Sequence, residues 1–275
     1  MSELTLSPQV FSILSGLVEE RVGLAYGPAD RSIFESKAST RALEAGFESM
    51  LDYYYYLRYD DPDQREFRAL VEALLVHETY FFRELASLRV AIDTFVRPVV
   101  EAHGRARIWC AACSTGEEPT TMAMLLHERG LLGRVELLAS DVSDDALARA
   151  RSGRFGRRAL RESSPSALAA RYIERRGTEL WVAPALTAAI DFRNVNLVDP
   201  EQVSALGHFD LIVCRNVLIY LRDERAREVV GRLSRQLPAG GVLLVGVSES
   251  LLRFGSELHC EEHGGVFFYR KPGRP

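Results

Sequence analysis

The 275-residue sequence predicts an all-helical N-terminal domain followed by an α/β domain built on a mostly parallel sheet. Two observations lead to this prediction. Residues 1–75 carry apolar residues at helical spacing with no strand pattern between them, whereas short apolar runs alternate with helical patterns after Gly104. The length also exceeds the usual range of about 100–200 residues for one domain, so two domains are expected.

The first helices of the N-terminal domain have recognisable ends. Apolar residues recur at helical spacing over residues 10–24. A second helix is predicted to begin at a capping residue, Asp30, and to stop at Gly46.

The tyrosine-rich run at residues 50–61, "MLDYYYYLRYDD", has two interpretations. It could form an aromatic box for a ligand. However, Tyr53, Tyr56 and Tyr59 recur every three residues, which suits one face of a helix with the phenols at the surface. We therefore predict that these rings pack against the core of the helical domain.

The next segment links the two domains. Residues 61–77 are predicted to form a helix capped at Asp61 or Asp63, and the helical pattern then continues to a break at Gly104. The boundary at residues 76–103 therefore reads as a helical linker, which indicates that the two domains pack together.

The second domain, residues 104–275, alternates strands and helices. Each strand run is apolar and short, and each helix run is amphipathic, a pattern typical of a parallel sheet covered on both faces. The predicted strands are 106–112, 135–140, 209–214, 240–247 and 266–271, and the predicted helices are 116–130, 141–153 and 223–237. An insertion at about 174–194 contains the runs "LWVA" and "AIDF", which predict a small antiparallel β-subdomain.

Composition and charge exclude several functions. The chain has 47% apolar and 26% charged residues and a net charge of −4, so no basic domain suggests nucleic-acid binding. No signal peptide pattern and no apolar stretch of about 18 residues are present, which predicts a cytoplasmic protein without membrane insertion. Cys110 and Cys113 form a C-x-x-C without a second ligand pair, so we predict no metal and read them as small core residues.

The loop "ACSTGEEP", Ala112 to Pro119, is the first indication of a ligand. A glycine loop between a strand and a helix usually binds an anion, but here Glu117 and Glu118 fill the first helical turn. They would repel the pyrophosphate of a dinucleotide. Asp141 closes the second strand, where an acidic residue bonds ribose hydroxyls in Rossmann-type sites. A nucleoside without phosphates, such as S-adenosylmethionine, fits both features.

Six motifs in the same order resemble the CheR family of chemotaxis-receptor methyltransferases. They are "HETYFFRE", "ACSTGEEP", "ASDVSDDALARARSGRF", "FRNVNL", "FDLIVCRNVLIYL" and "GGVLLVGVSESL". The resemblance covers about residues 5 to 270. It implies a Rossmann-like S-adenosylmethionine-dependent methyltransferase domain with a small antiparallel β-subdomain. It also implies methyl transfer to glutamate side chains on the cytoplasmic helices of a chemoreceptor, which resets its signalling.

The resemblance also implies which residues form the site. Arg83 and Tyr220 are the candidates for the reacting centre, and Arg83 could hold either the substrate or the cofactor. The implied cofactor contacts are His77, Thr79, Arg83, Glu118, Asp141, Asn196, Leu197, Arg215 and Asn216. His77 replaces the asparagine usual in the family, so cofactor binding could depend on pH.

Several of these residues also have purely structural interpretations. Thr79 could cap a helix, Asn196 could bond a turn backbone, and Arg215 could form a surface ion pair. Asp141 could be a helix N-cap, and Tyr220 could be a core aromatic.

The receptor-binding features depart from the usual family pattern. Residues 1–75 hold seven Arg or Lys against thirteen Asp or Glu, and only Arg31, Lys37 and Arg41 mark a basic helix face for an acidic receptor. The hairpin "ERRGTELWV" is short, and Glu179 is predicted to lie beside the edge of the subdomain, which predicts independence from a receptor pentapeptide tether. Two other functions stay open: a sensor or scaffold that binds S-adenosylmethionine without turnover, and a methyltransferase for another protein or a small molecule.

Overall fold

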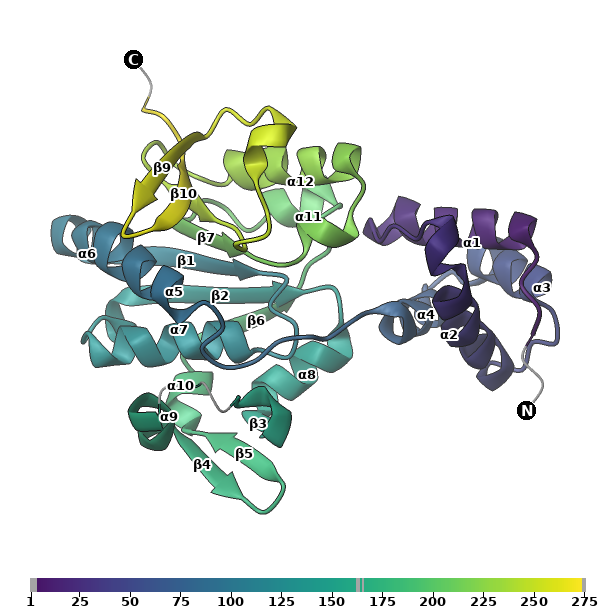
Figure 1. Cartoon of the computed structure of the whole chain (residues 1–275), viewed down its shortest axis with the longest axis horizontal. Coiled ribbons are helices and arrows are strands. Elements are labelled where there is room, and N and C mark those ends of the chain that lie inside the picture. Colours follow the sequence, from purple (N-terminus) through teal and green to yellow (C-terminus); the bar gives the residue numbers. More distant parts are fainter. Residues whose placement is uncertain (1–3, 162–163, 165, 274–275) are drawn as a thin grey trace. The chain divides into compact units, whose positions relative to one another are not determined.

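The computed structural model describes residues 4–161, 164 and 166–273. The chain divides into two compact units (Figure 1). The first runs to Val76 and also includes Tyr220–Arg222. The second contains His77–Ile219 and the chain from Asp223 onward.

The first unit is helical, as predicted. Its helices are α1 (Pro8–Val22), α2 (Arg31–Glu44), α3 (Met50–Tyr55) and α4 (Arg65–Leu74). Asp61 caps the beginning of α4, as predicted, although it lies four residues before the first helical residue. Its carboxylate accepts hydrogen bonds from the N–H groups of Arg65 and Phe67 at 2.9 and 2.8 Å. Asp30 precedes α2 without capping it; its carboxylate instead accepts a hydrogen bond from the Gly27 N–H at 2.8 Å.

The three tyrosines do not share one buried face. Tyr53 is fully buried and donates a hydrogen bond to Glu66 at 2.8 Å, but Tyr56 is half-buried and the Tyr59 side chain is 70% exposed. Three residues advance a helix by about 300°, so rings at this spacing drift around it, and a π-helical turn at Tyr56–Asp60 changes the spacing further. Leu57 is therefore the buried residue there, and the prediction was wrong for Tyr59.

The predicted basic face of α2 is used inside the helical unit. The Arg31 guanidinium bonds the carbonyl of Leu6, and Lys37 donates to the carbonyls of Leu74 and Leu75 at the end of α4. Arg41 donates two hydrogen bonds to the carboxylate of Glu66 at 2.7 and 2.6 Å, and a third to Glu44. These contacts hold the helical unit together, because each basic side chain on α2 bonds a carbonyl or a carboxylate of another segment of the unit.

The linker is helical only in its second part. Residues 75–80 have no regular structure and 81–84 form a turn, before α5 (Leu85–Ala91), a π-helical turn (Ile92–Val96) and α6 (Arg97–His103). Within the second unit, Phe81 N–H bonds the Ala159 carbonyl at 2.8 Å and Phe82 N–H bonds the Thr121 hydroxyl at 3.2 Å. The prediction of a continuous helical linker was wrong because these hydrogen bonds hold the backbone in a non-helical path.

The second unit is built on a seven-stranded sheet with strand order β6-β2-β1-β7-β8-β10-β9 (Figure 1). The five parallel strands are β1 (Ala106–Ala111), β2 (Val135–Asp141), β6 (Ile190–Asn194), β7 (Leu211–Cys214) and β8 (Val242–Leu244). Two antiparallel strands, β9 (His259–His263) and β10 (Val266–Arg270), complete one side. The helices between them are α7 (Glu117–Glu128), α8 (Asp144–Ser152), α11 (Pro200–Ser204) and α12 (Asp223–Arg235).

The strand order determines where a ligand can bind. From β1 the chain adds strands on one side, through β2 to β6, and then crosses to the other side of β1 at β7. In open α/β sheets, ligands bind beyond the carboxyl ends of the strands where the order reverses. The loops after β1 and β7 are therefore the expected walls of a site.

A separate three-stranded antiparallel sheet has the order β3-β5-β4. Its strands are β3 (Arg154–Gly156), β4 (Ile173–Arg176) and β5 (Glu179–Val182), accompanied by α9 (Ser166–Tyr172) and α10 (Pro184–Thr187). The subdomain was therefore correctly predicted as antiparallel, but its limits of 174–194 were wrong. The run "AIDF" belongs to β6, an edge strand parallel to β2, and its alternating burial resembles that of a half-buried antiparallel strand.

Three of the four cysteines are small residues of the core, as predicted for Cys110 and Cys113. Cys110, Cys113 and Cys214 are buried free thiols, and Cys260 is exposed. Among the residues that the structure describes, no group of three potential ligands is placed to hold a metal ion. No helix in the described ranges is long and apolar enough to span a membrane.

Candidate functional site

Strained backbone marks the carboxyl edge of the main sheet. Within the described chain, six non-glycine residues have positive φ, and five of them lie in the segments discussed below: Phe82, Glu84, Ala112, Ser114 and Asn216. Such conformations persist where the surrounding structure enforces them, and they cluster at ligand sites. The strain thus points to the same edge as the strand order.

The glycine loop between β1 and α7 is held by close packing and by Asp141. Gly116 has φ of 94°, and a Cβ built on it would lie 2.5 Å from the Cβ of Ala150 in α8, so only glycine fits. The Asp141 carboxylate accepts hydrogen bonds from the N–H groups of Ser114 at 2.8 Å and Ser143 at 3.0 Å. Asp141 thereby ties the loop after β1 to the loop after β2.

The Asp141 carboxylate is buried but can still accept a hydrogen bond from a ligand. Burial raises the pKa of its carboxyl, and the backbone N–H groups and His77 partly offset this effect. The residue that caps α8 is Ser143, whose hydroxyl accepts a hydrogen bond from the Ala146 N–H. A carboxylate has about four acceptor positions, so Asp141 can still bond a ligand hydroxyl.

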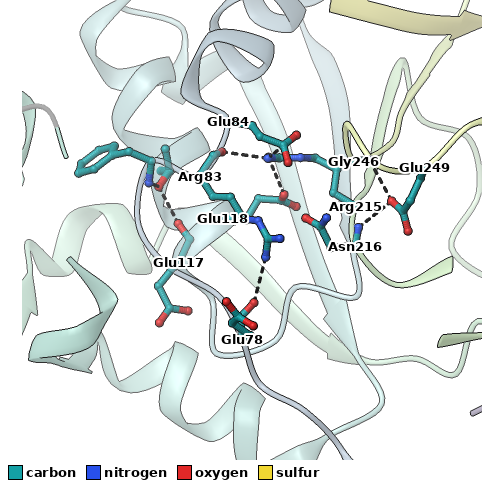
Figure 2. Close-up of polar contacts among 11 residues, drawn as sticks. Glu78, Arg83, Glu84, Glu117, Glu118, Arg215, Asn216, Gly246 and Glu249 are labelled. Carbon is teal, nitrogen blue, oxygen red and sulfur yellow. Dashed lines mark hydrogen bonds and ion pairs between the residues drawn. The ribbon is translucent and has the colours of Figure 1, made fainter. Parts of the chain in front are cut away.

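Glu117 and Glu118 differ in role. Glu117 is buried and accepts a hydrogen bond from the Thr115 hydroxyl at 2.7 Å. Glu118 accepts one from Arg215 Nη1 at 2.9 Å (Figure 2). Burial raises the pKa of Glu118 to about 7; Arg215 opposes this rise, and the like charge of Glu84 adds to it.

Arg215, which follows β7, is an internal ion-pair residue. Its side chain is 1% exposed and lies between Glu118 and Glu84, with Nη2 3.1 Å from Glu84 Oε2 (Figure 2). Nη2 also donates to the Arg83 carbonyl at 2.9 Å. The guanidinium therefore joins the linker segment to α7, and its burial contradicts the alternative interpretation of Arg215 as a surface ion pair.

The remaining linker residues lie on this edge as well. His77 Nδ1 is 3.2 Å from the Ser114 hydroxyl oxygen, which places it beside the glycine loop. Thr79 and Arg83 are half-buried, and Arg83 Nη1 donates to the Glu78 carbonyl at 3.1 Å. The Arg83 guanidinium also lies over the Tyr80 ring, with 5.6 Å to its centroid.

Asn196 and Leu197 follow β6. The Asn196 side-chain oxygen accepts a hydrogen bond from the Val198 N–H at 3.2 Å, which is the turn role that the sequence allowed. The neighbouring Val195 N–H bonds the Asp141 carbonyl at 3.0 Å. This segment therefore begins directly beside Asp141.

Tyr220 is the predicted site residue that belongs to the first unit. Its carbonyl accepts a hydrogen bond from the Ala25 N–H at 2.9 Å, and the next residue, Leu221, forms a bridge with Leu24. Its side chain is 37% exposed, so it is not a core aromatic.

Sequence reasoning missed Glu249. Its buried carboxylate accepts hydrogen bonds from the N–H groups of Asn216 and Gly246 (Figure 2). It also accepts one from the N–H of Leu218. The signal in the sequence was an acidic residue shortly after an apolar strand, in "GVSES", which is the pattern that identified Asp141.

The donor set suits a ligand with hydroxyl and cationic groups. Asp141 ends β2 and Glu118 lies in the first turn of α7, and both carboxylates lie beside the glycine loop. Carboxylates attract hydroxyl donors and cations and repel phosphates. The residues therefore fit S-adenosylmethionine better than a dinucleotide.

Comparisons with known proteins cover both units. Residues 9–75 match the family model described as "CheR methyltransferase, all-alpha domain", and residues 77–263 match "CheR methyltransferase, SAM binding domain". Chemotaxis protein methyltransferase 2 of Vibrio cholerae is 30% identical over 99% of this chain and 96% of its own length. Chemotaxis protein methyltransferase 1 of Pseudomonas aeruginosa is 32% identical over 88% of this chain and 90% of its own. The chemotaxis protein methyltransferase of Escherichia coli is 31% identical, with 90% and 86% covered.

Proposed function

Because this chain belongs to the CheR methyltransferase family, we propose that it transfers a methyl group from S-adenosylmethionine to glutamate carboxylates of a chemoreceptor. The product is a glutamate methyl ester. The observation that supports this most directly is the glycine loop flanked by Asp141 and Glu118 at the point where the strand order reverses. That loop accommodates a nucleoside without phosphates.

Each part of the site has a proposed role toward the cofactor. Asp141 is proposed to bond the ribose hydroxyls and Glu118 to face the cationic methionine part, while Asn196 and Asn216 offer neutral hydrogen-bonding groups. Thr79, Leu197 and His77 complete the wall, and Arg215 holds Glu118 in place. When bound, the cofactor supplies an electrophilic methyl group on its sulfonium.

The substrate glutamate needs orientation rather than activation. Its carboxyl group has a reference pKa near ~4.3 and is already ionised at neutral pH, so no general base is required. The enzyme has to exclude water and align the carboxylate with the methyl group, an effect that can supply roughly 7–11 kcal/mol. Arg83 is proposed to orient the incoming carboxylate through its planar guanidinium. Tyr220 is kept as a candidate for the reacting centre on the family resemblance alone.

The proposed partner is the methylation region of a chemoreceptor, recognised without a pentapeptide tether. Support comes from the hairpin between β4 and β5, which turns through two residues, Gly177 and Thr178. The charge argument for this was wrong: Glu179 lies in β5, the central strand, and accepts a hydrogen bond from the Trp181 ring N–H. Exposed Arg175 and Arg176 lie on the edge strand β4 instead.

The tether proposal can be tested by titration. An acidic, aromatic-rich pentapeptide is expected to bind more weakly than about 10 μM, which corresponds to roughly −7 kcal/mol. Tighter binding would show that the short hairpin still admits a peptide strand.

The proposed activity is tested with methyl-labelled S-adenosylmethionine and membranes that contain the matching receptor. We expect label in the receptor that alkali releases as methanol, since esters are base-labile. Asp141→Ala is the matched control, because it should bind the cofactor poorly in the same fold. Cofactor binding by calorimetry without any transfer would favour the sensor, and label in another protein would favour a different substrate.

A further inference from the structure

Glu249 lies in the loop after β8 and is a buried acid, with 7% of its surface exposed. Its Oε2 accepts hydrogen bonds from the N–H groups of Asn216 at 2.7 Å and Gly246 at 2.9 Å. Its Oε1 accepts one from Leu218 at 2.8 Å. A single side chain therefore fixes the backbone of two loops, one after β7 and one after β8 (Figure 2).

These contacts bear on a strained residue. Asn216 has φ of 59°, a left-handed conformation that costs a non-glycine residue energy and persists only when its surroundings enforce it. The 2.7 Å bond from its N–H to the Glu249 carboxylate is short, as hydrogen bonds to carboxylates are. Glu249 thus stabilises the conformation that sets the direction of the Asn216 side chain.

Gly246 closes the arrangement from the other side. A Cβ at this position would lie 2.8 Å from Asn216 Nδ2 and 3.0 Å from Glu249 Oε2. The missing side chain leaves the space in which the Asn216 amide and the carboxylate sit together. The loop after β7 and the loop after β8 therefore pack so closely at Gly246 that no side chain fits there.

We propose that Glu249 is a positioning residue for cofactor binding: it holds Asn216 in its strained conformation and directs the Asn216 amide toward the cofactor. This inference rests on the proposed function. It adds to that function a residue that does not itself contact the reacting atoms. Three backbone donors on one carboxylate also explain why an acid, and no amide, is required there, since an amide has only one oxygen.

The test uses Glu249→Gln in the full-length protein, with S-adenosylhomocysteine binding by calorimetry and steady-state kinetics on the receptor. In this variant at least one buried N–H faces the amide NH2, so the loops shift. We expect the KM for S-adenosylmethionine and the Kd for S-adenosylhomocysteine to rise roughly tenfold or more, with kcat at saturating cofactor changed less than about threefold. A folded variant with unchanged KM and Kd would overturn the inference.

Asp61→Asn is the matched control for a loss of stability alone. Asp61 is likewise buried and accepts two backbone N–H bonds, but it does so in the first unit, at the start of α4. We expect a lower melting temperature and an unchanged KM. If this variant raises the KM as much as Glu249→Gln does, the effect of Glu249 is only structural and the inference fails.

If Glu249→Gln does not fold, Gly246→Ala tests the proposed positioning role of Glu249 instead. It keeps the carboxylate and should displace the Asn216 amide, so the same rise in Kd is expected; wild-type affinity in a folded Gly246→Ala would refute the inference. Failure of the wild-type protein to bind S-adenosylhomocysteine is a separate result, because it would remove the proposed function as well.

Discussion

Glu118→Gln should change how the stability of the second unit depends on pH. Glu118 is an acid whose burial raises its pKa from 4.5 to about 7, although Arg215 lies 2.9 Å away. Two carboxylates, those of Glu118 and Glu84, share this one guanidinium. The amide of glutamine keeps an oxygen that can accept the Arg215 hydrogen bond but does not titrate.

Thermodynamic linkage gives the sign and the size of the change in the free energy of unfolding with pH. Between pH 4.5 and 7 the folded protein keeps a proton on Glu118 that the unfolded chain has lost, so this group makes the folded state less stable as the pH rises. Each pH unit in this window contributes about 1.4 kcal/mol, which amounts to about 3 kcal/mol in all. Above pH 7 the difference is constant. The free energy of unfolding of wild type should therefore fall by about 3 kcal/mol relative to Glu118→Gln between pH 4.5 and 8.

Denaturant unfolding at several pH values measures this difference. Tryptophan fluorescence reports on the second unit alone, because both tryptophans, Trp109 and Trp181, lie within it. Comparing the two proteins at each pH removes the contributions of all other groups. Curves that stay parallel from pH 4.5 to 8 would show that Glu118 is ionised throughout, and the burial argument would be refuted.

Two further predictions concern the loop and its neighbours. Asp141→Ala should weaken S-adenosylhomocysteine binding by about 1.5–3 kcal/mol in calorimetry, the range for a charge-assisted hydrogen bond; unchanged affinity would mean that Asp141 only holds the loops. Gly116→Ala should lower the free energy of unfolding by at least about 1–3 kcal/mol from backbone strain, and adding Ala150→Gly should restore part of it by removing the 2.5 Å clash.

Much of the fold could be predicted because local patterns determine it. The alternation of apolar strands and amphipathic helices after Gly104 corresponds to β1, β2, β7 and β8 with the helices between them. Features that depend on how distant segments pack together could not be predicted from these local patterns. The π-helical turn beside Tyr59 and the placement of β6 in the main sheet depend on tertiary packing, which leaves little trace in the local sequence.

The site shows the same division. Asp141 could be predicted as a candidate because an acidic residue at the end of the second strand bonds the ribose hydroxyls in Rossmann-type sites. Glu249 has a similar local sequence, but its role depends on Asn216 and Gly246, which are 33 and 3 positions away from it. Backbone donors carry no side-chain signature, so this type of contact is visible only once the loops are folded.

Arg41 shows how a residue can suggest a binding surface and serve the core. In the sequence it is one of three basic residues on a helix, but in the folded unit its guanidinium forms two hydrogen bonds with Glu66, which also accepts one from the buried Tyr53 hydroxyl. Arg41→Glu would place a carboxylate against Glu66 and should destabilise the helical unit by about 2–3 kcal/mol, between the values for exposed and fully buried pairs, because the two side chains are 26% and 12% exposed.

The control for this prediction is Arg68→Glu, which makes the same charge change at an exposed position of α4. Far-UV circular dichroism during heating should show early melting of the helical unit for Arg41→Glu, whereas Arg68→Glu should melt near wild type. Loss of receptor methylation in Arg41→Glu would then follow from unfolding and would carry no information on docking. If Arg41→Glu melts like Arg68→Glu, the contacts with Glu66 contribute little to stability, and Arg41 is again a candidate for binding an acidic receptor.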